Sequence, residues 1–112
     1  MTTIASSPYP FSRTIASRAL RKAGGGEVSV QISEPQAVEN APDEWFCAYR
    51  IEGLGPVSVE GYALGIDGVQ ALLLAAVKIG DRLSLEADPL TFLGGPELRF
   101  PRTPSTDADF SL

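Results

Sequence analysis

The chain has 112 residues, of which 44% are hydrophobic and 21% charged, a composition that predicts one globular domain with a single core. Its net charge of −5 disfavours nucleic acid as a partner, because an acidic surface repels phosphate groups. No apolar run approaches the roughly 18 residues that cross a bilayer, so we expect no membrane segment.

Histidine is absent and cysteine occurs once, at Cys47, which excludes several kinds of chemistry. Without histidine the chain has no Ser–His–Asp triad and no Cys–His pair. The usual structural zinc sites also lack their ligands. We therefore expect no metal, no cofactor and no catalytic residue. A single cysteine cannot form an internal disulfide, which fits a cytoplasmic protein.

The beginning of the chain is basic and ends at a run of glycines. Residues 1–12 contain two prolines and several Ser and Thr, and we interpret them as a flexible arm. Residues 1–26 carry four basic side chains and no acid; mitochondrial presequences share this composition, but we favour the arm. A weak strand is expected over residues 14–22, followed by a turn at residues 24–26, where three glycines tolerate any backbone conformation.

Two strands are predicted next from the alternation of side chains. Residues 27–33 alternate with period two, which is typical of a half-buried antiparallel strand. Residues 34–44 contain two prolines and several acids, so we expect a solvated loop. Residues 45–53 form the third strand, with four side chains on its apolar face: Trp45, Cys47, Tyr49 and Ile51. This pattern predicts that Cys47 is a small buried hydrophobe and not a nucleophile.

The turn at residues 54–56 sets the register between the third strand and a fourth at residues 57–64. A two-residue loop would place apolar side chains opposite polar ones on both faces. A three-residue loop instead pairs Arg50 with Glu60 and Tyr49 with Gly61, so that opposite charges meet and a ring covers a bare backbone. We predict this second register, with Gly55 in the left-handed conformation that such loops use.

The only long helix is expected over residues 67–87, with Asp67 as the N-cap and Gln70 completing a capping box. Gly80 either interrupts this helix or allows a close approach. The predicted apolar stripe consists of Val69, Leu72, Leu73, Ala76, Ile79, Gly80 and Leu83. Leu74 and Val77 widen the stripe beyond what one sheet covers, which predicts a homodimer that buries Leu74 or the exposed sheet face.

A short last strand at residues 90–93 completes the elements, and residues 102–112 are expected to form a loose tail. The order predicts a single α+β domain over residues 13–101. Its architecture would be a four-stranded antiparallel meander with one long helix packed on one face and a short final strand, which satisfies the two-layer rule.

Five residues are predicted to contribute to a binding surface: Phe46, Arg50, Glu60, Tyr62 and Glu97. Arg50 and Glu60 lie on the polar face of the sheet and form either a cross-strand ion pair or a ligand contact. Phe46 and Tyr62 share that face, where a partner, the arm or the 34–44 loop would cover them. Glu97 belongs to a loop whose shape is fixed by glycines and prolines.

Three blocks of the sequence carry a resemblance: "WFCAYRIEGLG", "GIDGVQALLLA" and "FLGGPELRFP". Together they resemble a group of small bacterial single-domain proteins of unknown function, over roughly residues 17–102. The resemblance implies a bacterial source and a short domain. It transfers no catalytic residue.

The function expected from these observations is a non-enzymatic protein-interaction domain of a regulatory or toxin-neutralising type, because no catalytic set is present. An acidic body would suit a basic partner. The alternative is a small carboxylate-based enzyme or a small-ligand-binding domain, in which Asp43, Glu44 and Glu97 converge. A concave pocket with two convergent acids would favour this alternative.

Overall fold

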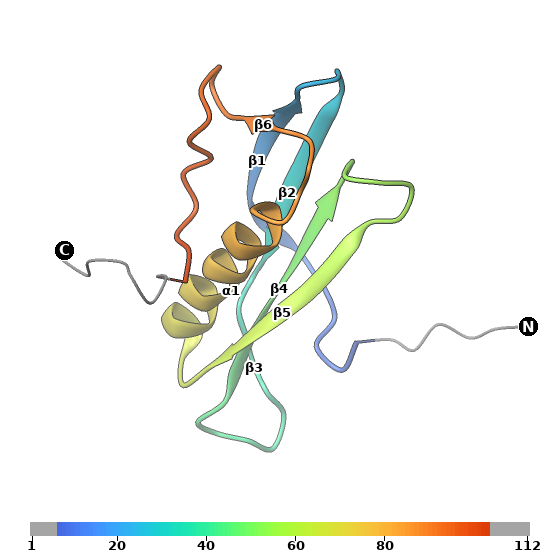
Figure 1. The fold of residues 1–112 in the computed structure, drawn as a ribbon. Helices are drawn as coiled ribbons and strands as arrows, with labels where there is room; N and C mark the ends of the chain where they lie inside the picture. Colours follow the sequence, from blue (N-terminus) through green and yellow to red (C-terminus); the bar gives the residue numbers. More distant parts are fainter. Residues whose placement is uncertain (1–6, 104–112) are drawn as a thin grey trace, which may run out of the picture.

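A computed structural model describes residues 7–103 of the chain (Figure 1). It contains an antiparallel sheet of six strands and one helix, which confirms the α+β class. The elements in chain order are β1 (Thr14–Lys22), β2 (Glu27–Ser33), β3 (Gln36–Ala37), β4 (Trp45–Glu52), β5 (Val59–Gly65), α1 (Gly68–Leu83) and β6 (Leu90–Thr91).

Neighbouring strands of the sheet follow one another closely along the chain. β1 pairs with β2, β2 with β4, and β4 with β5, while β6 pairs with the end of β1. β3 pairs with β4 beyond the end of β2, so the expected 34–44 loop is wrong at Gln36–Ala37. The four-stranded meander is therefore matched only in outline. Pro35 has no backbone N–H to donate to β4. This explains why pairing with β4 is interrupted between the end of β2 and β3.

The register between β4 and β5 is the predicted one. Arg50 lies opposite Glu60 and Tyr49 lies opposite Gly61. The connection is longer than expected, because β4 ends at residue 52 and β5 begins at residue 59. Gly53, and not Gly55, has the positive φ, at 104°. A Cβ atom on Gly53 would lie 2.3 Å from the backbone oxygen of Glu27, so the turn lies directly against the start of β2.

Helix α1 begins as predicted and ends earlier. Asp67 is the N-cap and accepts a hydrogen bond from the backbone N–H of Gln70 at 2.8 Å. The Gln70 side chain accepts one from the N–H of Ile66, also at 2.8 Å. The helix ends at Leu83 and not at residue 87. The N-cap is thus confirmed, but the capping box is only half formed, because Gln70 binds the N–H of Ile66 and not that of Asp67. The last turn of the expected helix is absent.

The face that α1 buries differs from the predicted stripe. The buried helix residues are Ala71, Ala75, Ile79, Gly80 and Leu83. Val69 and Leu73, which were expected to face the sheet, are exposed. A Cβ atom on Gly65 would lie 2.5 Å from the backbone nitrogen of Ala71, so the helix and β5 are almost in backbone contact. Only small side chains fit between them, and the larger side chains of the first turns point outward for this reason.

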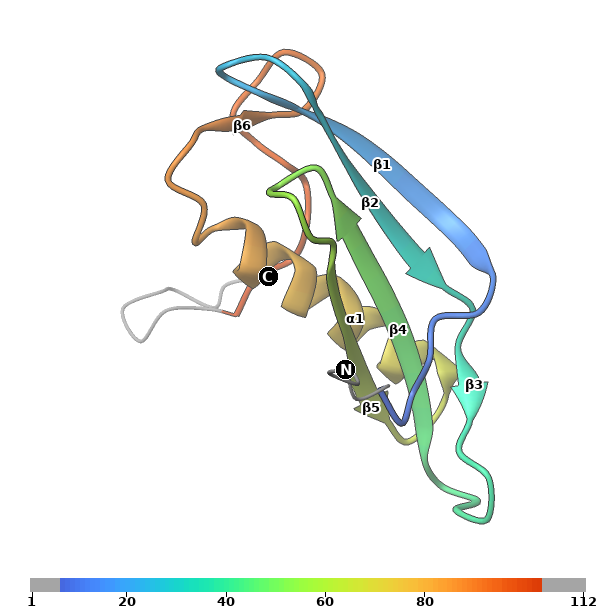
Figure 2. The same cartoon turned by 90° about the vertical axis from the view of Figure 1, so that its right-hand side faces the viewer.

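The core lies between the sheet and α1, which packs on β4 and β5 (Figure 2). Cys47, Tyr49 and Ile51 are part of it, as predicted, and Trp45 packs against its border. The Tyr49 ring covers the bare backbone of Gly61.

The segment after β6 runs beside α1 and covers the rest of that sheet face (Figure 1). Arg18 holds it in place: its guanidinium donates to the carbonyls of Leu98 and Arg99, at 3.0 and 2.9 Å. The same guanidinium lies over the rings of Phe92 and Phe100. A Cβ atom on Gly80 would lie 2.2 Å from the Pro101 carbonyl oxygen. Gly80 therefore allows the backbone at Pro101 to approach α1 closely, and it does not interrupt the helix, which continues to Leu83.

Candidate functional site

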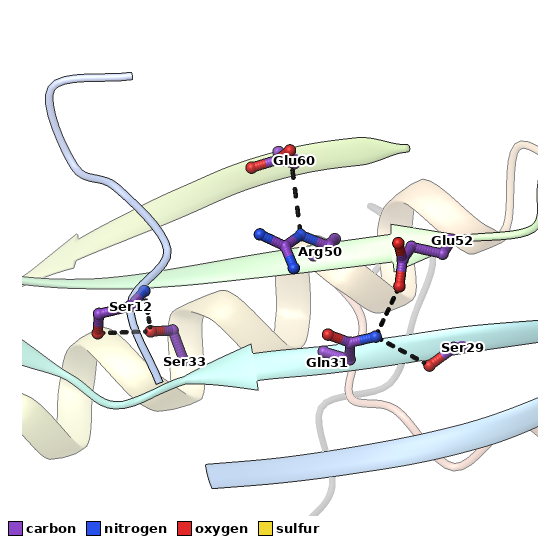
Figure 3. Close-up of polar contacts among 7 residues, drawn as sticks. All are labelled: Ser12, Ser29, Gln31, Ser33, Arg50, Glu52 and Glu60. Carbon is purple, nitrogen blue, oxygen red and sulfur yellow. Dashed lines mark hydrogen bonds and ion pairs between the residues drawn. The ribbon is translucent and has the colours of Figure 1, made fainter. Parts of the chain in front are cut away.

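The polar face of the sheet, opposite α1, contains Arg50 and Glu60 as predicted (Figure 3). The Arg50 Nε lies 4.0 Å from a Glu60 carboxylate oxygen, and the guanidinium also lies over the Phe11 ring, 4.2 Å from its centroid. On the neighbouring strand, the Gln31 amide donates to Glu52 at 2.8 Å. These polar groups therefore already have partners within the protein.

Phe46 and Tyr62 are covered by the segment that precedes β1. The Tyr9 ring lies 5.1 Å from the Phe46 ring and 4.6 Å from the Tyr62 ring, measured between centroids. Ser12 fastens the segment through its N–H and its hydroxyl, which contact the Ser33 hydroxyl at 2.9 and 3.1 Å (Figure 3). The sequence left a partner, the arm or the 34–44 loop as the cover of these two aromatic side chains, and in the structure it is the arm.

Only part of the predicted arm and tail can be compared with the structure. Residues 7–12 are described and lie on the sheet; residues 1–6 of the arm and residues 104–112 of the tail lie outside the described residues. The domain limits at residues 12 and 101 stay a prediction.

Glu97 does not join the other four predicted residues. It lines a separate cleft of about 370 Å³ between the end of α1 and the segment after β6. Neither Asp43 nor Glu44 lines this cleft, so the expected convergence of these acids with Glu97 is not found. The charged residues of the cleft are Glu86, Asp88, Glu97, Arg99 and Arg102.

Cys47 is buried and points into the core, as predicted. Its thiol donates to the Ser33 carbonyl at 3.3 Å. Burial raises the pKa of the Cys47 thiol to about 11, because the thiolate would lose its hydration. The nucleophilic form is therefore suppressed at neutral pH.

We expect Cys47 to react with a thiol reagent only after unfolding. At pH 8 labelling should be slow in the native protein and fast in denaturant, as followed by the absorbance of the released reagent. Since the folded pKa lies above the unfolded one, the folded state holds the proton more tightly. Stability should therefore fall as the pH rises from about 9 toward 11. Rapid labelling of folded protein would contradict the burial of Cys47.

An open apolar hollow of about 410 Å³ lies where α1 begins, next to Trp45. We call it the Trp45 hollow; its lining residues are Pro35, Trp45, Asp67, Gly68, Val69 and Leu72. A Cβ atom on Gly68 would lie in van der Waals contact with the Pro35 and Trp45 side chains, at 3.5 Å, so a side chain at this position would occupy part of the hollow.

Three exposed apolar side chains line the Trp45 hollow or adjoin its lining residues in the chain. Ile66, Val69 and Leu73 are 67%, 66% and 58% exposed. Val69 and Leu73 are four residues apart on α1 and therefore lie on the same side of the helix. Contiguous apolar surface of this kind marks interaction sites in soluble proteins.

Reasoning from the sequence missed the Trp45 hollow, because it assigned Val69 and Leu73 to the face packed on the sheet. A signal was nevertheless present. Small residues recur on β5 at Gly61, Ala63 and Gly65, and on α1 at Ala71 and Ala75. Two matching rows of small residues indicate close packing of a helix on a strand, which turns the neighbouring large side chains outward.

Over residues 7–103, no three potential metal ligands come together from His, Cys, Asp and Glu. In the same range, no helix combines the length and the apolar character needed to cross a membrane.

A comparison with family models identifies the family of this chain. A family model described as "Domain of unknown function (DUF6968)" matches residues 13–102, which include all six strands and the helix. No curated protein and no solved structure gives a significant match. An uncharacterised family, expected from the three sequence blocks, is thus supported, and the bacterial source stays a prediction. The chain belongs to the family described as a domain of unknown function, DUF6968.

Proposed function

We propose that this protein is a non-enzymatic protein-interaction domain whose Trp45 hollow receives an apolar side chain of a basic partner segment. The observation that carries the proposal is an open apolar hollow lined by Val69, which is 66% exposed. The exposed Leu73 lies one turn further along the same side of α1. Covering such side chains removes apolar area from water, the main favourable contribution to most protein association.

The charge of the partner segment follows from the surroundings of the hollow. Asp67 is the one charged residue among its lining residues. The protein as a whole carries a net charge of −5. Lysine or arginine beside the inserted apolar side chain would therefore accelerate association and fix its orientation.

The polar sheet face is a weaker candidate for the same role. Arg50 already has Glu60 and Phe11 as partners, and Tyr9 covers Phe46. A partner binding there would have to replace these contacts, whereas the Trp45 hollow is open.

Selection from a displayed peptide library tests this proposal. We expect the selected peptides to combine an aromatic or aliphatic residue with nearby lysine or arginine. Val69→Glu should weaken their binding at least tenfold, because it places a charge in the hollow. Leu85→Glu is the matched control, since Leu85 is an exposed aliphatic side chain beyond the end of α1, and it should leave binding unchanged. Equal binding by the two variants would refute the proposal.

A second candidate function, binding of a small charged ligand, is favoured by the cleft at Glu97. Acids and arginines line it together, which suits a ligand carrying both charges. Glu86 is already paired with Arg82 at 2.6 Å, which leaves Asp88 and Glu97 as the remaining acids of the lining. Amide shifts on titration with a small-molecule library would map to this cleft if the second function holds.

The cytoplasmic location and a regulatory or toxin-neutralising role remain predictions.

A further inference from the structure

The outer edge of β5 offers unpaired backbone groups. Over residues 7–103, β5 pairs only with β4 and ends one side of the sheet. The Lys78 ammonium donates to the Tyr62 carbonyl at 2.8 Å, so that carbonyl points away from β4. Backbone groups alternate along a strand, and those of Glu60 and Leu64 therefore point the same way as those of Tyr62. Such an edge is a template for a further strand.

Apolar side chains flank this edge in both layers of the protein. Leu64 on the polar face of the sheet is 38% exposed, and Leu74 on α1 is 41% exposed. The position of Leu74 along the edge follows from two contacts: Gln70 binds the N–H of Ile66, and Lys78 binds the carbonyl of Tyr62. Leu74 lies midway between Gln70 and Lys78 on α1. Leu64 lies midway between their partners Ile66 and Tyr62 along the chain. Leu74 and Leu64 are therefore at the same level along the edge.

We propose that β5 pairs antiparallel with β5 of a second copy of this chain, about a twofold axis at Ala63. In this register Tyr62 of each copy lies beside Leu64 of the other copy. Two aromatic–aliphatic pairs therefore form on the polar face. The outward backbone N–H and C=O groups of residue 62 in one copy then form hydrogen bonds with those of residue 64 in the other copy. The two Glu60 carboxylates stay about 20 Å apart, six residues of strand, so like charges do not meet.

The second copy is favoured over an unrelated strand because this one register satisfies several requirements together. It pairs the outward backbone groups, covers Leu64 on one face and brings the two Leu74 side chains toward each other on the other face. An isologous contact requires such self-complementarity. The Trp45 hollow lies on the other side of α1, so the dimer does not depend on the proposed function.

The size of the contact sets the expected strength. A seven-residue strand is about 23 Å long, and the edge formed by the sheet and α1 is about 20 Å thick. The contact therefore covers roughly 450 Å² of surface on each copy. The total of about 900 Å² is below that of stable complexes, so we expect a reversible dimer with a Kd on the order of tens of micromolar.

Lys78 weakens the dimer, because its ammonium occupies the Tyr62 carbonyl that the second copy needs. Lysine at a sheet edge commonly opposes further pairing in this way. Removing the side chain should therefore lower the Kd, a gain that damage to the fold cannot produce.

Sedimentation equilibrium of the full chain, from about 5 to 500 µM so as to bracket this Kd, tests the proposal. We expect dimer in the wild type, a Kd raised at least tenfold by Leu74→Glu, and a Kd lowered several-fold by Lys78→Ala. Leu73→Glu is the matched control: it changes the adjacent leucine, which is also exposed and lies on the other side of α1, and it should leave the Kd unchanged.

Amide hydrogen exchange checks the register. The N–H groups of Tyr62 and Leu64 should become protected as the concentration rises through the Kd. A monomer throughout the concentration range, a dimer that Leu74→Glu leaves intact, or edge amides whose protection is independent of concentration would each overturn the proposal.

Discussion

Gly53→Ala should destabilise the protein by about 3 kcal/mol, a large share of the stability of a domain of this size. Two causes add. The φ of 104° at Gly53 is one that side chains with a Cβ rarely adopt. The new methyl group would also lie 2.3 Å from the Glu27 carbonyl oxygen, a backbone atom that cannot move without shifting β2.

The same turn supplies the control. Gly55 lies two residues further on, and a Cβ atom there would have no neighbour within 4 Å. Gly55→Ala should therefore change the urea midpoint little. Equal losses in the two variants would mean that the turn is not fixed by the contact between Gly53 and β2. This pair of variants also separates the observed turn from the predicted one, in which Gly55 had the special conformation.

Arg18→Ala should cost about 2–4 kcal/mol and release the segment that follows β6. One guanidinium makes two charge-assisted hydrogen bonds to the Leu98 and Arg99 carbonyls and stacks with two aromatic rings. No other side chain of β1 contacts this segment through hydrogen bonds in the part of the chain that the structure describes. The substitution removes all of these interactions at once.

Urea unfolding and limited proteolysis together measure this effect. In Arg18→Ala, cleavage near residues 96–103 should become fast under native conditions, before global unfolding. Arg21→Ala is the control, because Arg21 is an exposed arginine of the same strand and lies on the opposite face. Proteolysis as slow in Arg18→Ala as in Arg21→Ala would show that the segment is held by its apolar contacts alone.

The close packing of backbone on backbone seen at Gly53 recurs at two other glycines. Gly65 approaches Ala71, and Gly80 approaches Pro101. Because α1 lies so near the sheet, its larger side chains are turned to either side. Val69 lines the Trp45 hollow, with Leu73 one turn further on the same side of α1, and Leu74 lies on the side of the β5 edge. Both proposed surfaces follow from this rotation of the helix.

The sequence by itself determined the local structure. Alternation in residues 27–33 and 45–52 specified two strands and the side chains that face the core, because a strand's side chains follow a period of two. The register of β4 and β5 followed from matching charge with charge and ring with glycine. Asp67 specified the start of α1, because an N-cap depends only on neighbouring residues.

Only the tertiary structure decided which surfaces are free. Periodicity shows that a helix has an apolar side, but the rotation of α1 depends on Gly65 and on small residues that lie far apart in the chain. Likewise, Phe46 and Tyr62 have the pattern of an exposed patch, and only the return of Tyr9 across the sheet covers them. Such contacts join residues widely separated in sequence, and their geometry is set by how whole elements pack and not by local preference.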